Sequence, residues 1–160
     1  MRRIRIVAIL GGLAIVGSVI GARSVLATPP SGVGAPFTVR ATLDRYHFDS
    51  DDFKIFQKDR EDVVMRELTI AASGDSGWHT HPGPALVIIT QGTGSLYEGD
   101  DPMCMAQTFG PGQGFVEQPG MVHILRNEGA TQLVLFVTFL NVPIGGGFRS
   151  DAPRPGNCSF

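Results

Sequence analysis

The sequence predicts an all-β protein, an antiparallel sandwich or barrel, that follows an N-terminal export segment. Two observations predict this fold class: the apolar runs are short and closely spaced, and residues that favour turns stand between them. The chain of 160 residues contains 21 glycines and 11 prolines, and it shows no long amphipathic helical pattern. Its length favours a single folded domain.

Residues 1–27 have the three-part layout of a secretory signal peptide. Three arginines lie among the first five residues, residues 6–22 are uncharged and mostly apolar, and the segment ending at Ala27 suits cleavage there. An uncleaved membrane anchor is the alternative, because an apolar run of about 17 residues is at the short edge of what crosses a bilayer. Both interpretations place the folded domain outside the cytoplasm, either secreted or anchored.

The charge of the remaining chain limits its partners. After residue 27 there are nine basic and fifteen acidic residues, so the folded part is net negative. This argues against nucleic acid or an anionic membrane as a partner, and a membrane contact is expected only if the N-terminal segment stays uncleaved. The acidic stretch 49–62 matches no calcium-loop spacing and is interpreted as a solvated surface.

The expected elements follow in order along the chain. Residues 28–36 are rich in proline and glycine and are interpreted as a linker. Residues 37–144 are expected to form the barrel, and residues 145–160, again rich in glycine and proline, an irregular tail. Turn residues at 91–94 and 110–114 separate neighbouring strands. Expected strands cover residues 37–43, 53–58, 62–71, 79–81, 85–90, 94–97, 115–116, 122–125 and 131–140.

The chain has two cysteines, Cys104 and Cys158. They are too far apart for a local metal motif, and outside the cytoplasm such a pair is usually oxidised. The sequence therefore predicts a disulfide that ties the tail to the loop after Tyr97, with two free thiols as the alternative. Closing a loop of about 55 residues stabilises the fold by about 4 kcal/mol in the chain-entropy model.

Three of the four histidines stand in two short segments, residues 77–84 and 119–123. His79 and His81 are two residues apart, so on a strand both imidazoles point to the same face. His123 comes from a separate strand, and prolines and glycines beside both segments fix the turns that aim them. The pattern predicts a metal site made of His79, His81 and His123, whereas His47 lies outside it.

The two segments resemble the two conserved motifs of the cupin superfamily. The first motif is matched by His79-Thr80-His81 with Gly92, although its opening glycine, Gly74, is displaced by one position. The second motif is matched by Gly112, Gly120, His123 and Asn127, with Pro119 shifted by one. The resemblance covers residues 37–141 and implies a cupin barrel, also called a double-stranded β-helix or jelly roll. Because cupins often pair through sheet edges, a homodimer is also expected.

This chain departs from the family pattern at one ligand. The family's glutamate corresponds to Ala85, which cannot coordinate a metal. The implied site is therefore three neutral histidines, as in thiol dioxygenases and certain diketone-cleaving cupins. Three imidazoles suit iron(II), zinc, copper, nickel or manganese, and the metal's identity stays open.

Further residues are candidates for the surroundings of the site. Glu117 is the catalytic candidate, as a general base or as a replacement for the lost carboxylate, and a solvent-facing glutamate is the alternative. Trp78 is a candidate wall of the pocket mouth. Ala85, Val87 and Ile89 share one strand face and are expected to line an apolar pocket. The other candidates near the metal are Gln118, Arg126 and Tyr97.

These observations favour an exported cupin that binds one divalent metal and acts on a small organic molecule as a dioxygenase-type oxidoreductase. The alternative is a non-catalytic cupin that binds a metal or a small ligand, and a third hypothesis is a structural or storage-type cupin without a metal. Since cupins host many functions, the fold does not decide whether the chain is an enzyme, and no residue identifies the substrate.

Overall fold

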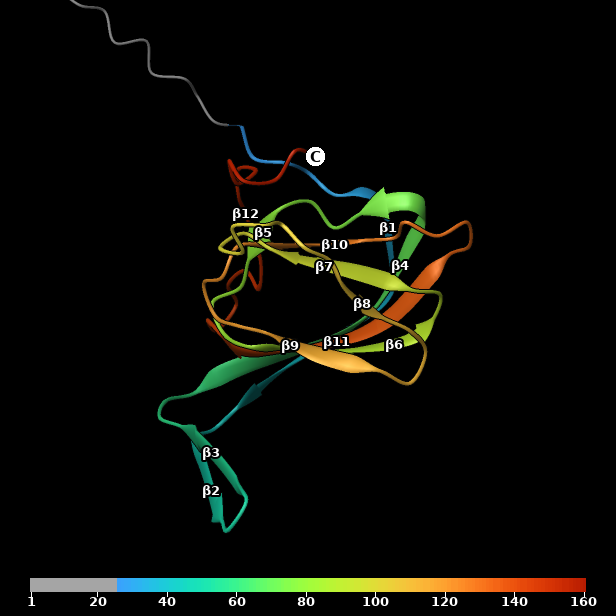
Figure 1. Cartoon of the computed structure of the whole chain (residues 1–160). Helices are drawn as coiled ribbons and strands as arrows, with labels where there is room; N and C mark the ends of the chain where they lie inside the picture. The colour runs from blue at the N-terminus through green and yellow to red at the C-terminus, as the bar shows by residue number, and fades with distance from the viewer. Residues whose placement is uncertain (1–25) are drawn as a thin grey trace, which may run out of the picture.

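The computed structural model describes residues 26–160 and shows a barrel of two facing antiparallel sheets (Figure 1). The first sheet has the strand order β1-β4-β11-β6-β9, and the second has the order β8-β7-β10-β5-β12. They join where Arg126 of β10 pairs with Asp75 at the end of β4. This arrangement confirms the predicted all-β barrel.

Twelve strands make up the described part of the chain. They are β1 (Ser31–Leu43), β2 (Tyr46–Ser50), β3 (Phe53–Gln57), β4 (Glu61–Asp75), β5 (His79–Thr80), β6 (Ala85–Gln91), β7 (Gly94–Glu98), β8 (Gln107–Phe109), β9 (Gly114–Glu117), β10 (His123–Arg126), β11 (Leu133–Val142) and β12 (Ser150–Asp151). Within residues 26–160 no helix is long and apolar enough to cross a membrane. The predicted signal or anchor segment lies almost entirely in residues 1–25, outside the described residues.

Alternation along the central strands builds the core between the sheets. On β6, Ala85, Val87 and Ile89 are buried whereas Leu86 and Ile88 are exposed, as expected when successive side chains point to opposite faces of a sheet. The neighbouring strand β11 contributes four further buried side chains in the same way: Leu133, Leu135, Val137 and Phe139. This core fixes which residues of each strand face the interior of the barrel.

The structure differs from the expected linker over residues 28–36, because β1 already begins at Ser31. The strand accommodates Pro36 because it is an edge strand that pairs only with β4, and because the register shifts between Gly34 and Phe37. The tail over residues 145–160 is also more ordered than expected, since it contains β12, which pairs with β5.

The acidic stretch 49–62 is only partly the solvated surface that the sequence predicts. Strands β2 and β3 form a separate hairpin that projects from the barrel (Figure 1), and its three aspartates are exposed, as is Asp59 after it. Glu61 and Asp62, however, are buried at the start of β4. Asp62 accepts hydrogen bonds from the Thr42 hydroxyl at 2.6 Å and the Gly145 amide at 2.8 Å, so it joins β1 to the tail.

The predicted disulfide between Cys104 and Cys158 is present. Cys158 lies in a second apolar cluster that also contains Trp78, Tyr97, Ile124 and Ala152. Because Leu96 and Leu125 point into the barrel core, their neighbours Tyr97 and Ile124 lie on the outer face of the second sheet. The tail covers that face and is held there by the disulfide.

Candidate metal centre

The fold brings His79, His81 and His123 together at one point. His79 of β5 and His123 of β10 are direct partners across two antiparallel strands, and His81 follows β5 closely. Their ring centroids lie 4.4 to 5.1 Å apart, and all three side chains are buried. One ligand nitrogen from each ring lies within 4.8 Å of the others. The three histidines are therefore positioned to bind a metal ion.

Backbone carbonyl groups orient all three imidazole rings. The Nδ1 atoms of His79, His81 and His123 lie 2.7, 2.7 and 2.9 Å from the carbonyl oxygens of Gly77, Phe148 and Met121, respectively. Since a carbonyl oxygen can only accept, each Nδ1 carries the hydrogen in the hydrogen-bonded arrangement, and the neutral ring keeps a lone pair on Nε2. This tautomer leaves the Nε2 atoms free to coordinate a metal.

His79 is held in the neutral form. Burial, followed by the proximity of His123, Arg149 and His81, lowers the pKa of His79 from 6.5 to about 2. A neutral imidazole is the form that binds metals, because its lone pair is not occupied by a proton. At neutral pH His79 therefore needs no deprotonation before it can coordinate an ion.

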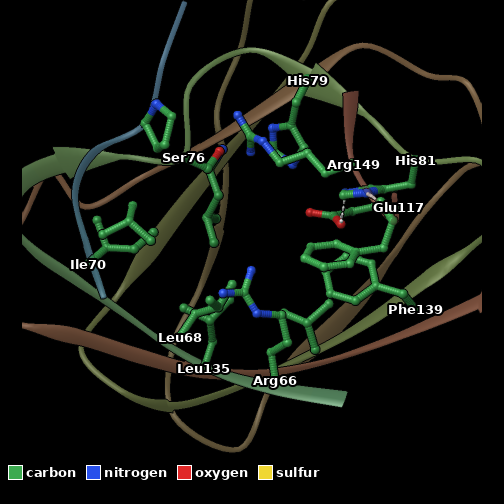
Figure 2. A pocket seen from close by; sticks show the side chains of 15 residues that line it. Arg66, Leu68, Ile70, Ser76, His79, His81, Glu117, Leu135, Phe139 and Arg149 are labelled. Atoms are coloured by element: carbon green, nitrogen blue, oxygen red, sulfur yellow. Dashed lines mark hydrogen bonds and ion pairs between the residues drawn. The ribbon is translucent and has the colours of Figure 1, made fainter. Parts of the chain in front are cut away.

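A carboxylate lies beside two of the three histidines, on a strand that the family pattern does not use for its glutamate. Glu117 of β9 is the direct partner of Ala85 on β6. Its Oε2 atom lies 3.1 Å from His81 Nε2 (Figure 2). Its Oε1 atom lies 3.3 Å from His123 Nε2. Of the two directions that the sequence left open for Glu117, the structure shows the inward one, with its buried carboxylate facing two of the three histidines. Glu117 occupies this space because side chains directly opposite on paired strands start only about 5 Å apart, and alanine leaves room.

The chemistry of these four groups calls for a cation. Burial alone would raise the pKa of Glu117, but its contacts with His123 and His81 outweigh burial and hold the pKa well below its usual range. That lowering requires a hydrogen on Nε2 of His81 and His123. With the hydrogen on Nδ1 instead, the carboxylate oxygens and the Nε2 lone pairs are all acceptors, and they face each other favourably only with a proton or a metal ion between them. The Nε2 atoms of His81 and His123 are buried without a hydrogen bond. Such a donor set fits a divalent metal ion.

A cavity of about 100 Å³ adjoins the histidines inside the barrel. Its walls are mostly apolar and come from β4, β11 and the tail (Figure 2). The prediction that Ala85, Val87 and Ile89 line this pocket is wrong, although they do face the interior. They pack in the core, and the apolar lining includes Leu68, Ile70, Leu135, Val137, Phe139 and Phe148.

Several candidate residues do not reach the site. Gln118 is exposed, and Trp78 packs in the second cluster with Tyr97 rather than at a pocket mouth. The Tyr97 hydroxyl and the Arg126 guanidinium both bind Glu128. His47 lies on the exposed β2–β3 hairpin, remote from the other three histidines in sequence and outside their cluster.

Two residues of the second motif have structural roles. Gly120 adopts a φ of 71°, a left-handed conformation that favours glycine, and its amide donates to the His81 carbonyl at 2.9 Å. Asn127 is almost fully buried, and its Nδ2 donates to the carbonyls of Ile70, Ala71 and Thr131. Gly120 thus connects the two motifs, and Asn127 fixes the loop that follows β10.

Two arginines that the sequence patterns did not predict line the cavity, Arg66 and Arg149. The sequence did contain a signal for Arg66. It lies two residues from Val64 and from Leu68, so it shares the inward face of its strand with these apolar residues and with Ile70. No comparable pattern surrounds Arg149, since it lies in the tail and reaches the cavity only through the pairing of β12 with β5.

Comparisons with known proteins agree with this architecture. The family model described as the cupin domain matches residues 66–139, which include the three histidines and Glu117. No curated protein sequence gives a significant match.

Similar solved structures include a cupin-like protein from Thermotoga maritima, with 20% identity, a TM-score of 0.48 and coverage of 57% of this chain and 65% of that one. An oxalate oxidase has 22% identity, a TM-score of 0.43 and coverage of 48% and 40%. The polyketide cyclase RemF from Streptomyces resistomycificus has 17% identity, a TM-score of 0.44 and coverage of 66% of both chains. The chain thus spans two thirds or less of these proteins, and such distant likenesses carry no argument about activity.

Proposed function

Because the chain belongs to the cupin superfamily and its barrel gathers three imidazoles and a carboxylate, we propose that it holds one divalent metal ion and acts with it on a small organic molecule. The reaction we propose is of the dioxygenase type, outside the cytoplasm. The observation that carries the proposal is the convergence of three oriented Nε2 lone pairs on the Glu117 carboxylate. The disulfide fits an oxidising compartment.

Each group of the site has a separate role in the proposed function. His79, His81 and His123 would hold the ion, and the backbone carbonyls on their Nδ1 atoms would fix the direction of each ring. Glu117 would supply the only negative charge among the four groups, as a fourth ligand or as a base next to the ion. When bound, the ion supplies Lewis-acid polarisation of a substrate oxygen and, if it is redox-active, electrons for oxygen chemistry. The apolar walls of the cavity would keep bulk water from the reacting groups.

Metal content tests the first half of the proposal. The purified protein is reconstituted anaerobically with iron(II), manganese, nickel, copper or zinc, freed of excess metal, and analysed by mass spectrometry of the elements. We expect one ion per chain for at least one of these metals, and a loss of the ion in His79→Ala and in His123→Ala. His47→Ala is the matched control, because this exposed histidine should leave the metal content unchanged. A wild-type protein that holds no metal under any of these conditions contradicts the proposal.

Oxygen consumption tests the second half. The metal-loaded protein is given a panel of small thiols, diketones, phenols and carboxylates while dissolved oxygen is recorded. We expect at least one compound to cause consumption that His79→Ala abolishes. Stoichiometric metal without consumption for any compound would instead support a non-catalytic cupin that binds a metal or a small ligand.

A further inference from the structure

Two arginines reach into the cavity beside the histidines. Arg66 extends from β4 and Arg149 from the segment just before β12, so they enter from different walls (Figure 2). The positions between and around them are apolar, including Leu68, Phe139 and Phe148. Both arginines are half-buried, so water reaches their guanidinium groups only in part, and an anion in the cavity would compensate their charge.

Arg66 lacks such compensation from the protein. No carboxylate of the described residues lies within ion-pair distance of it, in contrast to Arg40, Arg60, Arg126 and Arg149. Its Nε donates to the Thr38 hydroxyl at 3.1 Å, and its guanidinium lies 5.0 Å from the centre of the Phe148 ring. Within residues 26–160 its two Nη groups have no hydrogen-bond acceptor, so both remain available to a ligand.

Arg149 is only partly compensated. Its Nε donates to Asp151 Oδ1 at 2.8 Å. The Nη2 atom lies 2.7 Å from the same oxygen, but it is buried without hydrogen-bonding geometry to any described acceptor. Burial and the nearby Arg149 both lower the pKa of Arg66, which indicates that the two like charges repel each other across the cavity. An arginine nevertheless stays charged at physiological pH.

The charges around the cavity therefore leave a positive excess. The two arginines face the single carboxylate of Asp151, and the divalent ion of the proposed function would more than offset the charge of Glu117. A ligand carboxylate would relieve this excess, because it accepts paired hydrogen bonds from guanidinium groups. The apolar walls next to the arginines suit a hydrocarbon body rather than a second polar group.

Building on the proposed metal function, we infer that the substrate is a small monocarboxylate with an apolar body, whose carboxylate is bound by Arg66 and Arg149 next to the metal centre. The apolar body packs against Leu68, Phe139 and Phe148. The arginines then act as binding residues that place the rest of the substrate toward His79 and Glu117.

Calorimetric titration of the zinc-loaded full-length protein tests this inference, because zinc is not redox-active and leaves the ligand intact. The ligands are isobutyrate, its neutral analogue isobutyramide, and inorganic phosphate. We expect isobutyrate to bind at least about tenfold more tightly than isobutyramide, as charge-assisted hydrogen bonds predict. Phosphate should bind more weakly than isobutyrate, because it has no apolar body.

Variants separate the arginines from the metal as the source of this preference. Arg66→Met should lower the affinity for isobutyrate by at least about tenfold and leave that for isobutyramide within about twofold. Arg66→Lys should lose less affinity for isobutyrate than Arg66→Met. Lysine keeps the positive charge but lacks the planar guanidinium that donates paired hydrogen bonds. Arg149→Met should behave like Arg66→Met if thermal unfolding shows that its tail remains folded. Arg60→Met, at an exposed ion pair, is the matched control and should match the wild type.

The outcomes distinguish this inference from the proposed function. A protein that holds zinc but binds acid and amide equally, binds phosphate best, or is unaffected by Arg66→Met overturns the inference and leaves the metal function intact. A protein that holds no zinc or other metal fails the proposed function, and the inference falls with it.

Discussion

Glu117 and Ala85 face each other across β9 and β6, and this pair shows how the carboxylate of the site depends on one residue. We expect Glu117→Gln to weaken metal binding at least about tenfold, because it removes the only negative charge near three neutral imidazoles. Competition with a metal-binding dye measures the affinity. Glu128→Gln is the control, since Glu128 binds Tyr97 away from the site. An unchanged affinity in Glu117→Gln would show that the carboxylate does not serve the metal.

The same pair allows a reciprocal test. In Ala85→Glu/Glu117→Ala the carboxylate moves to the directly opposite position, where it can reach the same space. We expect the double variant to bind metal more tightly than Glu117→Gln, and the dye competition above measures this. If the double variant and Glu117→Gln bind the metal equally weakly, the position of the carboxylate is required as well as its presence.

Asn127 carries a prediction about stability. Replacing it with alanine leaves the buried carbonyls of Ile70, Ala71 and Thr131 without their donor. We expect Asn127→Ala to lower the free energy of unfolding by about 3 kcal/mol, measured by denaturant titration. Asn157→Ala, at an exposed position, is the control and should cost less. A loss below that of the control would contradict the structural role of Asn127.

At the residue scale, the sequence predicted the three histidines but left the role of Glu117 open. The two-residue spacing of His79 and His81 places both rings on the same face of a strand. This holds for any partner strand, so it could be predicted without the fold. For Glu117, alternation gives two possible directions, and only the register of β9 against β6 selects the inward one. Arg149 depends on a tertiary contact of the tail, which no local pattern encodes.

At the element scale, strands with clear alternation were predictable and short or edge strands were not. The sequence showed β6 and β11 because their buried faces alternate with exposed ones. In contrast, β1 is exposed along almost its whole length, so its first residues show no periodicity and were interpreted as linker. The two-residue strand β12 forms only because β5 offers a partner for it.

The attachment of the tail can be tested by removing its disulfide. Cys104–Cys158 closes a loop across a sequence separation of 54 residues, and the tail that it anchors carries Phe148 and Arg149. We expect Cys104→Ser/Cys158→Ser to lower the free energy of unfolding by about 4 kcal/mol, measured by denaturant titration. Because the Phe148 carbonyl orients His81, metal affinity should also fall. A variant with wild-type stability would show that the bond does not constrain the chain.

At the scale of the whole molecule, the outer face of the first sheet predicts self-association. Neighbouring strands expose a set of apolar side chains there: Phe37, Val39, Met65, Leu86, Ile88, Val116 and Phe136. Soluble monomers rarely expose large apolar patches. Glu67, the direct partner of Phe37 on β1 and of Phe136 on β11, is the charged residue of this patch, and a twofold contact would have to keep its two copies apart. The expected homodimer remains a prediction.

Light scattering coupled to gel filtration tests the dimer. We expect the wild type to have twice the mass of one chain and Ile88→Asp/Phe136→Asp to have the mass of one. The β2–β3 hairpin also exposes aromatic side chains, so Phe48→Asp is a matched variant that should stay dimeric. A monomeric wild type, or a dimer that persists in the double variant, would contradict this use of the face.

We propose that His79, His81 and His123 bind one metal ion and that Glu117 either coordinates this ion or contacts one of its ligands. X-ray absorption spectroscopy of the protein reconstituted with zinc measures these bonds most directly. We predict three imidazole nitrogens at about 2.0–2.1 Å and at least one oxygen at about 2.0–2.2 Å, with one imidazole fewer in His123→Ala. A spectrum with fewer than three imidazoles in the wild type, or one unchanged by His123→Ala, would contradict the claim.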